Sequence, residues 1–196
     1  LINKKISIKK NILYEYGNLF YKSYYLSKNN LFPYIDAKIA ISKDYFTKNL
    51  KKKFITNKHS LSRSHLLRSQ YDSIVSTSKS INEDNSRLDC RIEGMSYKSP
   101  KIFIIDRFLK LKKKLDIYKK NNDIYLLTTI DEKKKLNFFT KKGIKIINFK
   151  NMSSVIDYSK IFSKIQKIGG SRIMLESGLT FLNFMILSNF INYLYV

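Results

Sequence analysis

Short apolar runs alternate with longer polar or amphipathic stretches along most of the chain, a pattern that predicts strands separated by helices. The apolar runs are rich in β-branched residues and predict strands over the later part of 32–42 and over 72–76, 101–106, 123–129, 144–149, 172–176 and 191–196. Continuous apolar runs are typical of strands that a parallel sheet buries on both faces. The pattern therefore predicts an α/β fold with a mostly parallel central sheet flanked by helices.

Helical signals lie between several of these strands. The helices are expected over 58–69, 154–167 and 178–188. Asn57 is a favourable N-cap for the first of them, and Leu61, Leu66 and Leu67 give it one apolar stripe. Residues 77–91 lack such a pattern and are expected to form a polar connection.

The last stretch of the chain, 179–196, contains no charged residue and is close to the lower length limit of a membrane span. Asn183, Asn189 and Asn192 interrupt it, and polar amides are disfavoured in lipid. A buried helix followed by a buried strand explains the run better. We therefore expect no membrane partner.

Ligands of a parallel sheet gather at the carboxyl ends of its strands. Four polar segments follow predicted strands at that edge, namely 42–53, 77–91, 106–110 and 176–180. The functional site is expected there.

The net charge of +23 comes almost entirely from lysine. Such an excess suggests a nucleic acid or another polyanion as a partner. The lysines nevertheless lie in scattered short runs such as 51–53, 112–114 and 133–135, without one stripe or the aromatic signature of an RNA-binding surface. We favour a solvated surface and expect no nucleic-acid partner, with a smaller share of the charge serving ligands that carry phosphate.

Cys90 is the only cysteine, which excludes a disulfide or a cysteine-based zinc site within the chain. His59 and His65 stand among Ser and Leu without acidic partners, so no metal site is expected. Both histidines are interpreted as ordinary residues of a helix surface.

Three features could carry chemistry, and each has a plainer alternative. Residues 176–180 form a small-residue turn before a helix, whose free N–H groups would suit a diphosphate, although many such turns bind nothing. Arg68 and Arg91 could bind phosphate with Asp84 accepting from a ribose hydroxyl, or all three could belong to a salt-bridged surface loop. Lys38 interrupts an apolar strand, where it lines a cleft or points to a solvent edge.

Several segments resemble, in order, the reductase domain of the bifunctional riboflavin-biosynthesis deaminase–reductase. The family's Pro-Tyr-strand-Lys-Leu-Ala-x-Ser-x-Asp stretch is similar to residues 33–44, PYIDAKIAISKD. Its Leu-Arg-x-x-x-Asp-Ala-Ile stretch is similar to 67–74, LRSQYDSI, and its Thr-Val-x-x-Asp-x-Pro-x-Leu-x-x-Arg stretch aligns without a gap with 80–91, SINEDNSRLDCR. The Glu-Gly-Gly-x-x-Leu turn is similar to 176–181, ESGLTF.

The resemblance implies a dihydrofolate-reductase-like fold and hydride transfer from NADPH. It also implies a phosphorylated ribosylamino-pyrimidine substrate, 5-amino-6-(5-phosphoribosylamino)uracil, whose ribosyl group is reduced to ribityl. Carried over by position, Lys38 lies at the reaction centre, and the substrate positions are Arg68, Leu88, Arg91 and Glu176. The cofactor positions are Ala40, Phe54, Ser80, Asp84, Arg107, Gly178, Leu179, Thr180, Phe181, Leu182, Asn183 and Phe184.

The chain departs from the family pattern at several of these places. Phe54 stands for a Trp, Asn57 for a Ser, Ser86 for a Pro, and Arg107 for a Ser. Arg107 could contact the 2′-phosphate of NADPH or be solvated. A degenerate, non-catalytic homologue is therefore an alternative to an active enzyme, as is a basic nucleic-acid-binding α/β domain.

The resemblance also divides the chain. Residues 1–31 resemble the junction or tail of a preceding deaminase domain, and 32–196 correspond to the reductase domain, which we expect to be truncated at its C-terminus. It further implies a homodimer, fusion to a zinc deaminase domain in the full protein, and a cytoplasmic location.

Overall fold

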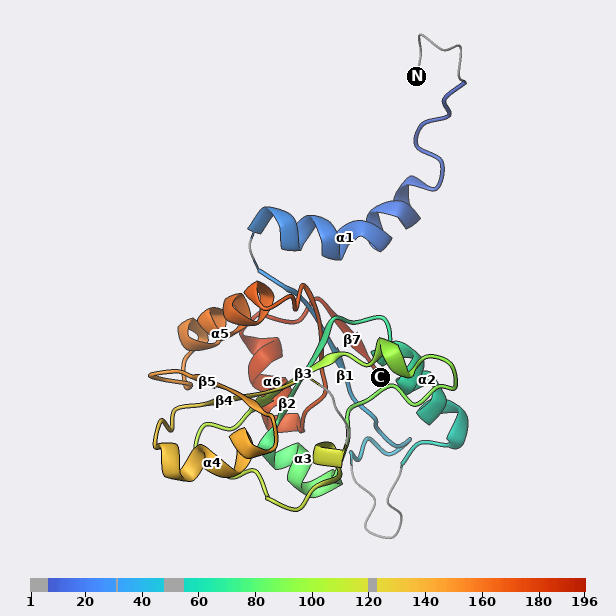
Figure 1. The fold of residues 1–196 in the computed structure, drawn as a ribbon. Coiled ribbons are helices and arrows are strands. Elements are labelled where there is room, and N and C mark those ends of the chain that lie inside the picture. Colours follow the sequence, from blue (N-terminus) through green and yellow to red (C-terminus); the bar gives the residue numbers. More distant parts are fainter. Residues whose placement is uncertain (1–6, 31, 48–54, 120–122) are drawn as a thin grey trace.

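The computed structural model describes residues 7–30, 32–47, 55–119 and 123–196, which form one sheet flanked by helices (Figure 1). The strands are β1 (Tyr34–Lys38), β2 (Ser73–Thr77), β3 (Lys101–Ile105), β4 (Ile124–Thr128), β5 (Lys145–Asn148), β6 (Arg172–Leu175) and β7 (Tyr193–Tyr195). Their order across the sheet is β5-β4-β3-β2-β6-β1-β7, and every neighbouring pair is parallel. The predicted parallel sheet and its strands are confirmed, and the ends of β2 to β7 shift by no more than two residues. Strand β1 lies in the earlier part of 32–42 and not in its later part, because it ends at Lys38.

Helices cover both faces of this sheet. The α-helices of the described residues are α1 (Tyr14–Asn30), α2 (Lys58–Arg68), α3 (Ser78–Asp84), α4 (Lys133–Lys141), α5 (Val155–Lys167) and α6 (Leu179–Leu187), of which α1 lies outside the two layers (Figure 1). One apolar cluster joins α5 and α6 to the sheet through side chains such as Phe162 and Met185. A second cluster on the opposite face includes Ile81 of α3 and Phe139 of α4. The sheet is thus buried between two helical layers, as its apolar strands require.

The predicted helix after Asn57 is confirmed, but its apolar stripe is wrong in part. The Asn57 side chain accepts a hydrogen bond from the Ser60 backbone N–H at 2.9 Å, as a helix N-cap does. Leu66, however, is 45% exposed. The residue that α2 buries is Arg68, because a carboxylate from another element meets its guanidinium there.

The predicted polar connection over 77–91 is also wrong in part, because it contains α3. The Thr77 side chain caps this helix by accepting from the Ser80 N–H, and Ile81 is fully buried beneath it. One buried apolar residue in a short helix is too weak a periodic signal for pattern analysis. Helices α1 and α4 were likewise not expected.

The charge-free run at the end of the chain folds as α6 followed by β7, as expected. Leu182 and Met185 of α6 are buried, whereas Tyr193 and Leu194 of β7 are exposed. The expectation of a buried last strand is therefore wrong, because β7 lies at the edge of the sheet with β1 on one side alone. Among the described residues, no helix is both long and apolar enough to cross a membrane.

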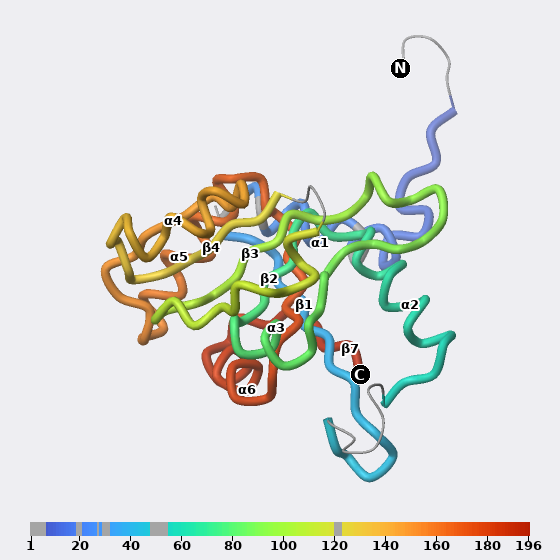
Figure 2. Tube along the Cα trace, turned by 60° about the horizontal axis from the view of Figure 1, so that its bottom comes forward, coloured from blue at the N-terminus to red at the C-terminus, as the bar shows by residue number. Residues whose placement is uncertain are grey.

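The turns that follow neighbouring strands meet at the carboxyl edge of the sheet. Strands β2 and β6 are paired, and the turns that follow them, at the starts of α3 and α6, meet at this edge. The two helices then run on opposite faces of the sheet (Figures 1 and 2). Residues 39–47, which follow β1, project from the body (Figure 2). These connections position the candidate site.

Candidate functional site

Lys38 ends β1 and lies beside the carboxyl end of β6. In the register of the two strands Ala37 is opposite Leu175, so the next residues, Lys38 and Glu176, are neighbours. The Lys38 ammonium is one of the charges that lower the pKa of the Glu176 carboxyl. Strand β7 flanks β1, so Lys38 is half-buried inside the sheet instead of on its outer strand.

Arg68 and Glu176 form a buried, two-pronged ion pair. The Arg68 Nε and Nη2 groups donate to the two Glu176 carboxylate oxygens at 2.7 and 2.8 Å, and the side chains are only 11% and 12% exposed. Burial alone would raise the pKa of Glu176, but the Arg68 charge and hydrogen bonds outweigh it, so the pKa is lowered. Glu176 is therefore ionised at neutral pH.

The third donor of Arg68 connects this pair to the segment after α3. Arg68 Nη1 donates to the Asp89 carbonyl oxygen at 3.2 Å, and His65 Nδ1 lies 3.0 Å from the same oxygen. A carbonyl only accepts, so His65 carries its proton on Nδ1. Burial, followed by the charge of Arg68, lowers the pKa of His65, which keeps the imidazole neutral at pH 7.

Arg91 forms an ion pair with the buried carboxylate of Asp89. The Asp89 side chain is 0% exposed, with Arg91 Nε 3.4 Å from Oδ1 and Arg87 Nη2 3.6 Å from Oδ2. Leu88, between Arg87 and Asp89 in the sequence, is buried, and its backbone is left-handed with a φ of 54°. That conformation is strained for leucine and is of a kind that clusters at functional sites.

A hydrogen bond joins two of the predicted cofactor positions. Gly178 N–H donates to Ser80 Oγ at 2.9 Å, and Ser80 Oγ lies 3.0 Å from Thr77 Oγ1. This contact ties the start of α3 to the start of α6 across 98 residues of sequence. It places the turns after β2 and β6 against each other.

The amino end of α6 presents backbone donors without a side-chain cap. Gly178 is its N-cap residue and makes no side-chain cap hydrogen bond. Leu179, Thr180 and Asn183 are exposed. Uncapped N–H groups and the positive end of the helix dipole make this turn suited to an anion.

The side chains of the other α6 positions face the core. Leu182 is buried, and the rings of Phe181 and Phe184 both pack edge-on against Tyr158, with centroids 5.4 and 5.3 Å away. These side chains anchor α6 against α5, so what they can offer a ligand is the backbone of the turn.

Among the described residues, no hydrogen bond or ion pair joins the remaining predicted positions to Lys38, Arg68 or Glu176. Ala40 follows β1 and is half-buried, and Asp84 is exposed at the end of α3. Arg107 follows β3, where its guanidinium stacks over the ring of Phe108 at 4.8 Å. Phe54 lies outside the described residues.

Sequence reasoning missed three polar residues that organise the site. His65 is not an ordinary surface residue, and Asp89 and Arg87 were not singled out. His65 meets the Asp89 carbonyl from α2 across 24 residues, which spacing in the sequence does not indicate. Arg87, Asp89 and Arg91 instead alternate along one segment, and Arg87 was a usable signal since arginine is scarce in this chain.

A buried cluster behind Lys38 was also missed. Asp36 of β1 is 1% exposed and accepts from the Tyr71 hydroxyl at 2.6 Å, with the Arg172 guanidinium 3.9 Å away. Burial raises the pKa of Asp36, although Tyr71 and Arg172 act in the opposite direction. The cluster links β1, β6 and the start of β2.

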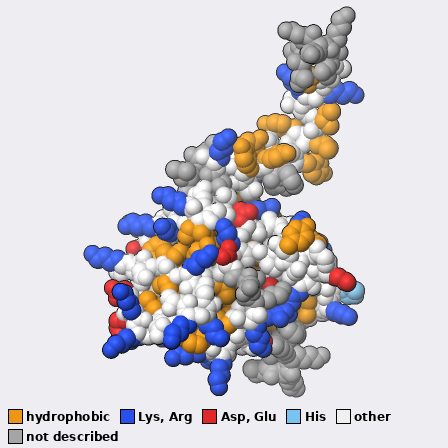
Figure 3. All heavy atoms as spheres, in the orientation of Figure 1, with side chains coloured by type: hydrophobic (Ala, Val, Ile, Leu, Met, Phe, Trp, Pro, Cys, Tyr) orange, Lys and Arg blue, Asp and Glu red, His pale blue; other side chains and the backbone are white. Residues whose placement is uncertain are grey.

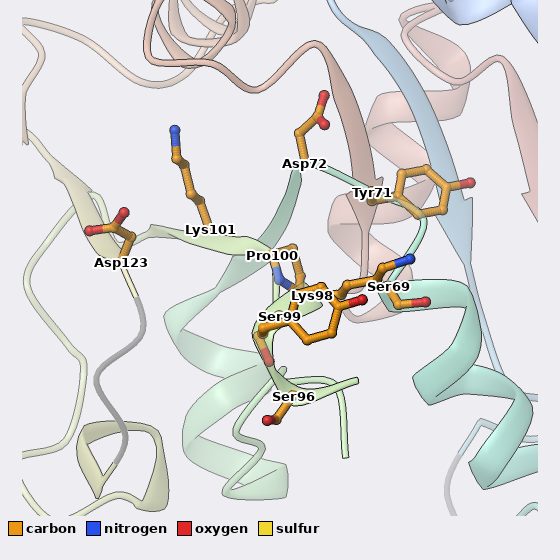
Figure 4. Close-up of a pocket in the computed structure, with 10 residues that line it drawn as sticks. Ser69, Tyr71, Asp72, Ser96, Lys98, Ser99, Pro100, Lys101 and Asp123 are labelled. Carbon is orange, nitrogen blue, oxygen red and sulfur yellow. The ribbon is translucent and has the colours of Figure 1, made fainter. Parts of the chain in front are cut away.

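A hollow of about 740 Å³ lies at the opposite, amino-terminal edge of the sheet (Figure 4). Its lining includes Asp72 before β2, Lys101 at the start of β3 and Asp123 before β4. None of the predicted site residues lines it. We therefore place the candidate site at the carboxyl edge, where charged groups converge.

Comparison with known proteins identifies the family of the chain. The sequence pattern of the RibD C-terminal domain matches residues 33–196. The chain belongs to the RibD C-terminal domain family. A search of curated proteins finds no match to the chain.

Solved structures show the same fold in family members. Acinetobacter baumannii RibD superposes with a TM-score of 0.76 at 15% identity, covering 97% of this chain and 52% of that protein. A Thermotoga maritima diaminohydroxyphosphoribosylaminopyrimidine deaminase/5-amino-6-(5-phosphoribosylamino)uracil reductase gives 0.70 at 17% identity, covering 90% and 47%. The Saccharomyces riboflavin biosynthesis reductase Rib7 gives 0.65 at 19%, covering 90% and 79%. The predicted reductase-domain fold, with its dihydrofolate-reductase-like architecture, is confirmed, and the chain spans about half the length of the first two proteins.

Proposed function

We propose that the chain reduces the ribosyl group of 5-amino-6-(5-phosphoribosylamino)uracil to the ribitylamino product with NADPH, a step of riboflavin biosynthesis. The observation that carries this proposal is the convergence of Lys38, Glu176 and Arg68 at the carboxyl edge of the sheet, beside the uncapped start of α6. Membership of the RibD C-terminal domain family supports it, as does the name of the Thermotoga relative. We include in the proposal a cytoplasmic homodimer, fused through residues 1–31 to a deaminase domain.

The donor set at the start of α6 fits the diphosphate of NADPH. The first-turn N–H groups have no side-chain cap, and Ser80 holds the N-cap residue Gly178 in place. When bound there, NADPH supplies a hydride to the substrate. Asp84 and Arg107 lie at the ends of α3 and β3, where they can contact the ribose and 2′-phosphate of the cofactor.

Lys38 is the residue of this site best suited to move a proton. Its ammonium lies beside the ionised Glu176, whose pKa it helps to lower. A proton held at Lys38 Nζ can be donated as the ring of the ribosylamine opens, which makes the sugar carbon accessible to reduction. Arg68 keeps Glu176 ionised and oriented, so it acts on Lys38 through Glu176.

Binding of NADPH to the purified chain tests the proposal directly. At 100 times its Kd, NADPH should stabilise the fold by about 2.7 kcal/mol, seen as a rise in Tm. Reduction of the pyrimidine substrate should then oxidise NADPH, which the absorbance of NADPH measures.

NADPH binding without turnover would indicate the degenerate homologue. A chain that ignores NADPH and is stabilised by RNA would favour the nucleic-acid alternative, which the spread of Lys and Arg over the face in Figure 3 does not support.

Ser80→Ala should weaken NADPH binding several-fold. The substitution leaves Gly178 N–H without its acceptor and frees the turn that presents the α6 donors, and one such hydrogen bond contributes about 1 kcal/mol. Calorimetric titration with NADPH measures the change. Ser159→Ala is the matched control, because Ser159 Oγ bonds the Val155 carbonyl on α5, away from the site. Equal NADPH affinity in the two variants would contradict a role for this contact.

A further inference from the structure

The carboxylate of Asp89 is withdrawn from water between two arginines. Its side chain is 0% exposed, whereas those of Arg87 and Arg91 are 32% and 49% exposed. Burying a carboxylate is costly unless cations meet it. The backbone of the same residue is fixed as well, because its carbonyl accepts from Arg68 and from His65. Asp89 is therefore held at both ends and gives the half-buried Arg87 and the exposed Arg91 a rigid base.

Each arginine uses only part of its guanidinium on Asp89. Arg91 approaches one carboxylate oxygen with Nε at 3.4 Å, and Arg87 approaches the other with Nη2 at 3.6 Å. Both distances exceed the 2.7–2.9 Å that is usual for charge-assisted hydrogen bonds. Among the described residues no other carboxylate forms an ion pair with either group. Donors on both arginines thus remain available for a further anion.

The charges favour an anion at this place. Arg87 and Arg91 bring two positive charges to one buried carboxylate, which leaves a local excess of one. A phosphate monoester carries a charge of about −1.5 to −2 at pH 7 and accepts through three oxygens. Arg68, in contrast, already spends Nε and Nη2 on Glu176 and Nη1 on the Asp89 carbonyl. Each of the three nitrogens of its guanidinium therefore already donates to a protein acceptor.

We propose that Arg87 and Arg91 together bind the phosphate of the substrate, and that Asp89 is the positioning residue that aims them. The proposal rests on the function proposed above and deepens it, because it assigns phosphate recognition to Arg87, a position that the family pattern leaves open. It replaces the expected pair of Arg68 and Arg91. The site recognises a sugar phosphate beside Asp89. Arg68, which donates to the Asp89 carbonyl, links it to Glu176 and Lys38.

Ribose 5-phosphate and ribose are the probes that isolate this site from catalysis. Calorimetric titration of the whole chain should show binding of ribose 5-phosphate and at least tenfold weaker binding of ribose. Arg87→Gln should raise the Kd for ribose 5-phosphate at least tenfold and leave the response to ribose unchanged. Arg63→Gln, which alters an exposed arginine of α2, should behave as the wild type.

Asp89→Asn tests the positioning role. With the phosphorylated pyrimidine and NADPH, Asp89→Asn and Arg87→Gln should both raise KM and leave kcat unchanged, because phosphate binding lies away from the reacting atoms. A merely structural Asp89 would lower Tm and kcat without selective loss for the phosphorylated probe.

The outcomes separate the two proposals. The phosphate site is overturned if Arg87→Gln binds ribose 5-phosphate as tightly as the wild type, or if the wild type does not bind it. Either result holds regardless of whether the chain catalyses the proposed reduction. Weakened binding in Arg87→Gln supports the phosphate site even if the wild type oxidises no NADPH, a result that would refute only the proposed reaction.

Discussion

Lys38→Met is expected to lower kcat by about 10²- to 10⁴-fold, the usual contribution of a positioned proton donor or acceptor. The substitution keeps the apolar stem that packs within β1 and removes the ammonium beside Glu176. Glu176 retains its bonds to Arg68, so it stays ionised and the fold is maintained. KM for the pyrimidine and the Tm rise with NADPH should therefore change little. Steady-state oxidation of NADPH measures the effect.

Lys145→Met supplies the matched control for that experiment. Lys145 is also a strand lysine with a carboxylate partner, Asp123 at 2.6 Å, but it lies on the outer strand β5 and is exposed. Its loss should leave kcat unchanged. If Lys38→Met and Lys145→Met turned over at the same rate as the wild type, Lys38 would have no part in the reaction.

Arg68→Met should reduce the free energy of unfolding by about 3–5 kcal/mol, the usual result of removing one partner from a buried ion pair. Glu176 would remain buried with the Lys38 charge as partial compensation, and the Asp89 carbonyl would lose a donor. Urea unfolding followed by circular dichroism measures the loss. The double variant Arg68→Met/Glu176→Gln should lose less than Arg68→Met, because no carboxylate is left without its partner. Equal losses would show that the ion pair is not the cause.

The pH dependence of Arg68→Met has a definite sign. In the wild type the pKa of Glu176 lies below its ordinary value of 4.5, so the pair contributes its full stability above that pH and loses it as pH falls through the lowered pKa. In the variant, burial acts without Arg68 and raises the pKa of Glu176, so protonation relieves the cost of the buried charge. The stability gap between the two proteins should narrow as pH falls from 7 towards 4.

Individual elements show why some of the fold could be predicted from the sequence. The strand over 101–105 and the capped helix α5 were expected because their signals are local, an apolar run in one and Ser154 with a capping box in the other. Helix α3 was missed because it is short and its one apolar residue is the buried Ile81. The exposure of β7 depends on its place in the strand order, which no local pattern encodes.

The candidate site was likewise predicted from the sequence only in part. Lys38, Arg68, Arg91 and Glu176 were selected from the sequence through motifs that resemble a known family. The pairing of Arg68 with Glu176 across 108 residues and the contact of His65 with Asp89 across 24 were not predicted, because these contacts join distant segments. Only the assembled sheet brings these segments to one edge.

By itself, then, the sequence determined the alternation of strands and helices, the parallel sheet and the edge at which ligands gather, since each depends on local patterning and on general rules of chain connection. The tertiary structure alone decided how the charges are shared. It paired Arg68 with Glu176, placed the half-buried Arg87 and the exposed Arg91 beside the two carboxylate oxygens of the buried Asp89, and set Lys38 inside the sheet. The physical reason is that the partner of a buried charge is set by three-dimensional proximity and burial, which separations along the chain do not specify.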